Sequence, residues 1–202
     1  MTNEELWKTP ITLEGKVVRL EPLSEAHIPA LALAGQNDSI WKFMLYDALT
    51  SKESMTAWVH EMLNRKQNGT DLPFTVIHLA SGRAAGATRY LEMRPAHRSL
   101  EIGGTWYAPI FQQTGVNIEC KYLMLKYAFE ELRCIRVQFK ADVRNEHSVR
   151  AIERLGAVRE GVLRNHYILQ DGTFRDSVYF SILDQEWSGV KVKLETKLAH
   201  QD

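Results

Sequence analysis

The chain has 202 residues, of which 45% are apolar, enough for one domain with a sizeable hydrophobic core. Its 25 basic and 25 acidic residues cancel, so net charge gives no argument for nucleic acid or an anionic membrane as a partner. No apolar run approaches the roughly 20 residues of a membrane helix, and the charged N-terminal residues do not form a secretion signal. We expect one cytoplasmic domain over residues 1–202, with a core at about 16–187 and a polar, loosely ordered tail at 188–202.

The first 93 residues predict two helices and three strands. Thr50 and Glu53 form a capping box before apolar residues at helical spacing, so a helix is expected from Thr50. Ser24 is placed to cap an earlier helix, and Ser81-Gly82 predicts a tight hairpin turn. The predicted elements are a strand at 17–20, helices at 24–35 and from 50, and strands at 73–79 and 84–93.

Residues 99–107 predict the next strand. Its alternation places Leu100, Ile102 and Trp106 on one face, with Glu101, Thr105 and Tyr107 on the other. Gly103-Gly104 interrupts this pattern, and paired glycines within a strand indicate a bulge or a close backbone approach.

A long helix follows at about 115–132, with Glu119 and Lys126 on its polar face. Alternation then predicts a strand from Ile135 to Asp142, in which Gln138 and Lys140 share a face. A helix at about 146–155 and a hairpin turning at Asp171-Gly172 complete the chain. A strand–helix–strand step through the long helix implies a parallel pair with a right-handed crossover, so the sheet is mixed.

The stretch from Gln112 to Asn117 lies between the strand that ends near Pro109 and the long helix. The first N–H groups of a helix have no internal acceptor, and the helix dipole adds partial positive charge there. A short turn with one glycine before such a helix predicts an anion site, suited to a pyrophosphate. The cysteines Cys120 and Cys134 have no second Cys or His at ligand spacing, so we expect no metal.

Several motifs now identify a resemblance. They are Glu101-Ile102-Gly103, Gln112-x-x-Gly115-x-Asn117, Asn145-x-x-Ser148 before Arg154-Leu155-Gly156-Ala157, and Glu160-Gly161-Val162-Leu163-Arg164. With the element order, from about Val17 to Trp187, they resemble the GNAT acyl-CoA N-acyltransferases, in the RimJ/RimL-like branch. The resemblance implies an α/β (α+β) GNAT fold. Its mixed central sheet of about seven strands would be flanked by helices, with two parallel strands splayed at the cofactor site.

The resemblance also implies acetyl-CoA as acyl donor and no metal. A main-chain N–H freed near Thr105 to Tyr107 would bond the thioester oxygen, and Asn145 would bond the pantetheine arm or simply cap its helix. Asn117 stands where the family prefers a tiny residue, and its side chain would either crowd the phosphate or donate to it. The cofactor-binding candidates are Trp106, Tyr107, Gln112, Gln113, Thr114, Gly115, Val116, Asn117, Asn145 and Ser148.

The catalytic candidates are Ser148, Glu101 and Tyr167. Ser148 would protonate the departing thiolate or fix its water, or would only make a local early-helix bond. Glu101 is the best acid for a general base, with a structural carboxylate as the alternative. Tyr167, with His166, is a candidate for base or substrate contact, or forms a half-exposed strand pair.

These candidates imply direct transfer of an acetyl group to a primary amine, without a covalent acyl-enzyme. The acceptor would be a peptide N-terminus, a polyamine or a small metabolite, because a fold does not select among them. The alternative is a non-catalytic module that binds acyl-CoA or a partner protein. The family habit also suggests a homodimer.

Overall fold

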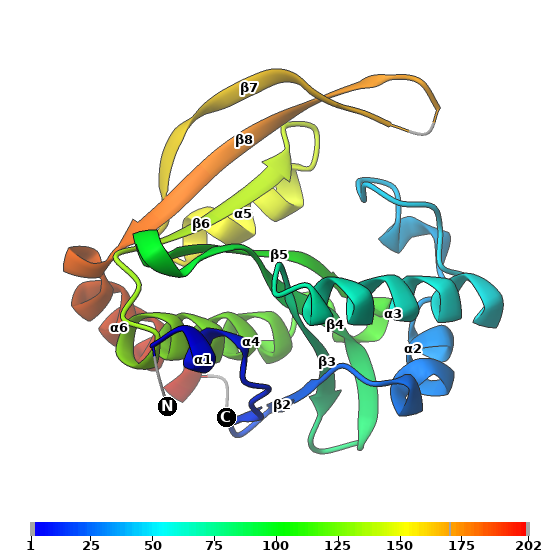
Figure 1. Ribbon diagram of the computed structural model, residues 1–202, viewed down its shortest axis with the longest axis horizontal. Coiled ribbons are helices and arrows are strands. Elements are labelled where there is room, and N and C mark those ends of the chain that lie inside the picture. The colour runs from blue at the N-terminus through cyan, green and yellow to red at the C-terminus, as the bar shows by residue number, and fades with distance from the viewer. Residues whose placement is uncertain (1–2, 170, 201–202) are drawn as a thin grey trace.

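The computed structural model describes residues 3–169 and 171–200 (Figure 1). Within them lie six α-helices and eight strands. The strands are β1 (Leu13–Glu14), β2 (Val18–Pro22), β3 (Leu72–His78), β4 (Arg83–Arg94), β5 (Ser99–Tyr107), β6 (Arg136–Asp142), β7 (Val158–Ile168) and β8 (Phe174–Leu183). The helices are α1 (Asn3–Lys8), α2 (Ile28–Ala34), α3 (Lys52–Gln67), α4 (Gly115–Lys126), α5 (Glu146–Arg154) and α6 (Asp184–Ala199).

The strands form one sheet in the order β1-β2-β3-β4-β5-β6-β8-β7. All neighbours are antiparallel except β5 and β6, which run parallel. The predicted mixed sheet with flanking helices is confirmed, but it has eight strands where about seven were expected. The two-residue β1 accounts for the difference, because it is too short to show an alternating pattern.

Helices α3 and α4 cover opposite faces of the sheet. Arg89 of β4 contacts Met62 of α3, whereas the hydroxyl of the adjacent Tyr90 donates to the Met124 carbonyl of α4. Since successive residues of a strand point to opposite faces, one face belongs to α3 and the other to α4.

The parallel pair β5–β6 is short. Pairing covers only Ser99 to Glu101 against Arg136 to Gln138, although β5 continues to Tyr107 and β6 to Asp142. The two strands therefore diverge toward their carboxyl ends (Figure 1). The main-chain groups of β5 beyond Glu101 that face β6 have no strand partner there, while pairing with β4 continues on the other side.

A bulge in β5 lies where the paired glycines predicted it. Ala87 and Arg89 of β4 are two residues apart, whereas their partners on β5, Trp106 and Gly103, are three residues apart. Gly104 adopts φ +57°, a conformation that side chains disfavour. The extra residue reverses the alternation, so the predicted faces after Gly104 are wrong. Trp106 lies on the α3 side with Trp58, and Thr105 lies on the α4 side.

Within the described residues, segments before residue 16 and after residue 187 join the core, beyond the expected limits of 16–187. Trp7 of α1 is fully buried, and the segment expected to be a loose tail forms α6 through Ala199. Trp187, Val190 and Leu194 recur at one-face helical spacing and are buried, which explains the order of this otherwise polar segment.

Two helix ends also differ from prediction. The N-cap of α3 is Ser51, which accepts from the Ser54 amide at 3.1 Å, so the expected capping box of Thr50 and Glu53 is wrong. The helix expected to reach Leu132 is α-helical only to Lys126 and continues as a π-helical turn, Tyr127–Glu131. Neither shift moves the residues at the start of α4.

Candidate functional site

The loop between β5 and α4 leaves the helix N-terminus open. Thr114 is the N-cap: its hydroxyl donates to the Phe111 carbonyl at 2.8 Å and accepts the Val116 amide at 3.3 Å. Gln113 has φ +58°, which turns the chain into the helix. The first amides of α4 have no acceptor one turn back, and only a long contact to Thr114 satisfies one of them. Val116 is fully buried, so its side chain belongs to the core.

A cavity of about 590 Å³ adjoins this loop on the side of the β3–β4 hairpin. Arg83 lies 5.9 Å from the Phe111 ring centroid, and His78 bonds Ser81 at 2.9 Å. A guanidinium beside an open helix N-terminus suits an anion such as phosphate. The lining residues include Val17, His78, Ser81, Arg83, Phe111, Gln113, Thr114 and Gly115.

The glutamines of the loop differ in their surroundings. The Gln112 side-chain amide donates to the Tyr107 carbonyl at 2.9 Å, so this group fastens the loop to the end of β5. Gln113 is exposed and lines the cavity, and Asn117 is half-buried in the first turn of α4. Of the two loop glutamines, Gln113 is thus the one whose side chain lines the cavity.

The side chains of Trp106 and Tyr107 belong to the core. Trp106 packs 4.9 Å from Trp41 between ring centroids, and Tyr107 lies beside Cys120, where burial raises its pKa well above the ordinary value. Both are under 10% exposed. A ligand at this strand can therefore meet them only through the main chain.

The start of α5 lies at the same sheet edge as the start of α4. Both helices follow the carboxyl ends of the parallel strands β5 and β6. The Asn145 side-chain oxygen accepts the Ser148 amide at 3.1 Å, which makes Asn145 the N-cap and leaves its NH2 group as a donor. Ser148 is half-buried one turn into the helix.

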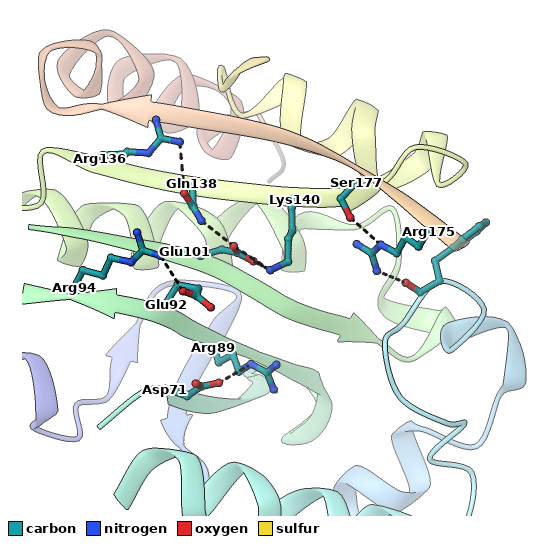
Figure 2. A network of polar contacts seen from close by, with 11 residues as sticks. Asp71, Arg89, Glu92, Arg94, Glu101, Arg136, Gln138, Lys140, Arg175 and Ser177 are labelled. Atoms are coloured by element: carbon teal, nitrogen blue, oxygen red, sulfur yellow. Dashed lines mark hydrogen bonds and ion pairs between the residues drawn. The ribbon is translucent and has the colours of Figure 1, made fainter. Parts of the chain in front are cut away.

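Glu101 lies at the point where β5 and β6 separate. Its carboxylate is 1% exposed and contacts Lys140 Nζ at 3.2 Å and Gln138 Nε2 at 3.1 Å, as Figure 2 shows. Burial raises the pKa of Glu101 and outweighs the opposing effects of Lys140 and Gln138. This buried acid holds its proton more tightly than an exposed glutamate does.

Tyr167 reaches the same cluster through a bulge in β7. Leu163 and Tyr167 of β7 are four residues apart, whereas their partners on β8, Ser177 and Arg175, are two residues apart. The Tyr167 ring centroid lies 5.6 Å from Lys140 Nζ and 4.0 Å from the His166 ring. Burial, followed by Lys140 and Arg175, lowers the pKa of His166, which favours a neutral imidazole.

The structure thus joins two of the three catalytic candidates. Glu101 and Tyr167 meet around Lys140, whereas no hydrogen bond or ion pair within residues 3–169 and 171–200 joins Ser148 to either. Lys140 and Gln138 were not predicted as site residues, although the alternation of their strand placed them on one face. Arg83 was also missed, because nothing local marks a hairpin arginine that lies near a distant loop.

The described residues contain no group of three or more His, Cys, Asp or Glu side chains arranged to hold a metal ion. In the same part of the chain, no helix has the length and apolar character needed to cross a membrane.

Residues 18–158 match the family model of the acetyltransferase (GNAT) domain. Putative ribosomal N-acetyltransferase YdaF of Bacillus subtilis (strain 168) is 35% identical over 113 residues, or 56% of this chain and 61% of YdaF. The match thus spans less than two thirds of YdaF. A GCN5-related N-acetyltransferase from Brucella melitensis superposes with a TM-score of 0.88 and 28% identity, over 94% of this chain and 86% of that one.

Mycobacterium smegmatis RimJ, solved in complex with CoA-disulfide, shares the fold. Its TM-score is 0.80 at 21% identity, over 96% of this chain and 97% of RimJ. The family model covers more than two thirds of the 202 residues. Together with the splayed parallel strands and the open start of α4, this match identifies the chain as a member of the GNAT acetyltransferase family.

Proposed function

We propose that the chain is an acetyl-CoA-dependent N-acetyltransferase that transfers acetyl directly to a primary amine. The observation that carries the proposal is the divergence of β5 from β6 beside the open N-terminus of α4. An unpaired strand edge offers main-chain donors and acceptors to an extended amide-containing arm. The open helix start and Arg83 offer donors to its phosphates.

When bound, acetyl-CoA supplies the thioester carbonyl carbon that the amine attacks. The amides of Gln113 to Asn117 would hold the pyrophosphate, and the Asn145 NH2 group would bond the pantetheine arm. Main-chain N–H groups of β5 near Trp106 and Tyr107 would stabilise charge on the thioester oxygen. Holding both reactants in attack geometry accounts for much of the rate.

Proton transfers fall to the polar side chains of the site. Glu101 would take the proton from the amine, directly or through water, because burial raises its pKa and so makes its carboxylate a stronger base. Tyr167 would position the amine over Lys140 and Glu101. Ser148 would give a proton to the departing thiolate or hold the water that does so.

The acceptor would be an amine-bearing small molecule or a peptide N-terminus. The name of YdaF refers to ribosomal N-acetylation. Peptides with free N-termini are therefore the first acceptors to test, before polyamines and small amino metabolites. The two free cysteines, Cys120 and Cys134, are both buried, which is consistent with a cytoplasmic protein.

A homodimer would be consistent with the exposed apolar residues of the edge strand β7. Val158 is 53% exposed and Ile168 is 73% exposed, and an apolar sheet edge tends to pair. Light scattering on the purified chain, at concentrations spanning two decades, would return twice the 23.2 kDa chain mass. A constant monomer mass would contradict the dimer.

The test of the activity is a thiol-release assay across an amine panel, run beside calorimetric titration with CoA. We expect CoA binding and release of thiol with at least one amine, in proportion to acetylated product found by mass spectrometry. CoA binding without release for any amine, peptide N-termini included, would contradict the enzyme and favour a binding module.

A further inference from the structure

Lys121 of α4 is buried against the sheet without a carboxylate partner. Its side chain lies beneath β4 and β5, and the residue is 6% exposed. Nζ donates to Thr105 Oγ1 at 2.5 Å and to Thr88 Oγ1 at 3.2 Å, and the two hydroxyls lie 2.8 Å apart. Across residues 3–169 and 171–200 no acid forms an ion pair with it. A lysine is rarely buried to this degree unless it is paired, so its place needs an explanation.

The lysine lies directly behind the bulge of β5. Thr105 follows Gly104 in the bulge, and its side chain points to α4 while its main chain lies in the stretch that has separated from β6. Covalent geometry keeps a threonine Oγ1 within about 3.5 Å of its own amide nitrogen. Lys121 Nζ is therefore within about 6 Å of the Thr105 amide, where an ammonium charge acts strongly in a dry interior.

We propose that Lys121 is a positioning residue for acyl transfer, which fixes the Thr105 bulge and places positive charge behind the main-chain donors that would meet the thioester oxygen. The inference rests on the proposed function. This role explains why the Lys121 ammonium lies in the core next to neutral hydroxyls only. A carboxylate partner there would cancel the positive electrostatic potential that Lys121 produces at the strand edge.

The charge on Lys121 depends on pH within an accessible range. Burial lowers its pKa to about 8, so the ammonium predominates at pH 7 and is lost as the pH rises through 8. Cys120 lies next to it on α4, and Tyr107 of β5 and Tyr90 of β4 lie on the same face of the sheet. All three are neutral, because burial raises the pKa of each. The carboxylates on this side of the sheet have other partners: Glu119 accepts the amides of Lys16, Val17 and Val18, and Glu195 of α6 accepts the Tyr122 hydroxyl.

Two variants separate the charge from the packing. Lys121→Met keeps an apolar stem of similar length and removes the charge, whereas Thr105→Val keeps the charge and breaks its link to the bulge. Lys126→Met, an exposed lysine on the same helix, is the matched control. We expect kcat to fall about 10- to 100-fold in Lys121→Met and less in Thr105→Val, while the Kd for CoA stays within about threefold of wild type.

The pH profile gives the first readout. The ratio of wild-type kcat to Lys121→Met kcat cancels the titration of the amine itself. It should be large below pH 7 and fall toward one above pH 9, because the charged form is the one that acts. A ratio that stays constant with pH, together with an altered melting temperature, would show that Lys121 only fills space.

The second readout needs no turnover. Acetyl-CoA labelled with ¹³C at the carbonyl is bound to each protein, and its C=O stretch is recorded by infrared difference spectroscopy. We expect a lower frequency in wild type than in free solution, with most of that shift lost in Lys121→Met. Equal frequencies in the two proteins would overturn the proposal. A normal shift in a wild-type protein that acetylates no amine would instead reject the proposed function and retain the effect of Lys121 on the thioester carbonyl.

Discussion

Lys140 Nζ lies 3.2 Å from Glu101 Oε1, across the point where β5 and β6 stop pairing (Figure 2). The pair is largely excluded from water, and burial still raises the pKa of Glu101 despite the neighbouring ammonium. The pKa of Lys140 is also raised: burial alone would lower it, but Glu101 and then Tyr167 more than offset that effect. The lysine thus keeps its charge, while the acid holds its proton more tightly than an exposed glutamate does.

Removing the acid should slow catalysis without weakening cofactor binding. Glu101→Gln keeps the shape and loses the base, so we expect kcat to fall about 100-fold or more with the Kd for CoA unchanged. Lys140→Met removes the charge that holds the Glu101 pKa down, so that pKa rises further. Since the ionised carboxylate is the active base, the acid limb of the kcat–pH profile moves to higher pH. Lys193→Met, exposed on α6, should leave the profile in place. An unmoved limb in Lys140→Met would contradict the role of Glu101.

A negative charge at the start of α4 should block the phosphate site. Gly115→Glu adds a carboxylate at the helix N-terminus, which is favourable for the helix but repels a pyrophosphate. We expect the Kd for CoA to rise at least 100-fold with no loss of melting temperature. Gly189→Glu on α6, where an added side chain meets open space, is the control. An unaltered Kd for CoA in Gly115→Glu would show that the phosphates bind elsewhere.

Most of the order of elements followed from local patterns, whereas the divergence of the parallel strands was expected from the family resemblance. The bulge in β5 was signalled by Gly103-Gly104, because few other residues would accept the φ of +57° found at Gly104. What alternation could not show was the effect of that bulge on later residues. One inserted residue turned Trp106 to the opposite face from the one predicted.

The site was harder to predict because its polar residues meet only through tertiary contacts. Glu119 falls on the polar face by helical period, yet it is 5% exposed and accepts hydrogen bonds from β2. Lys121 and Arg83 are likewise explained by neighbours distant in sequence. In contrast, the capping role of Asn145 was predicted, because capping depends on a few adjacent residues.

The two roles of Asn145 can be separated by substitution. Asn145→Asp keeps an oxygen that caps α5 but replaces the donor NH2 group with a second acceptor. We expect the melting temperature to stay near that of wild type and the CoA affinity to fall about tenfold. Asn145→Ala should lose both the cap of α5 and the CoA contact, and its free energy of unfolding should be about 1 kcal/mol lower. A wild-type CoA affinity in Asn145→Asp would leave Asn145 with the capping role alone.

Glu119 ties α4 to the first long strand of the sheet. Its carboxylate accepts the amides of Lys16, Val17 and Val18 at 2.7–2.8 Å. Glu119→Ala would leave buried donors unsatisfied, so we expect a loss of about 3–5 kcal/mol in the free energy of unfolding, measured by urea denaturation. Glu195→Ala removes an exposed carboxylate that bonds Tyr122 and should change stability by less than about 1 kcal/mol. Equal losses in the two variants would contradict an anchoring role for Glu119.

The terminal helix α6 should contribute to stability through its buried stripe. Leu194 is fully buried, and Glu130 of the π-helical turn bonds both Trp187 and Lys191 of α6. Leu194→Ala creates a cavity, so we expect a loss of about 2–4 kcal/mol. Val192→Ala, at a position 62% exposed, should change stability by less than about 0.5 kcal/mol. Hydrogen exchange should show slow amides in α6 that become fast in Leu194→Ala. If both variants unfold at the wild-type urea concentration, the buried stripe of α6 does not stabilise the domain.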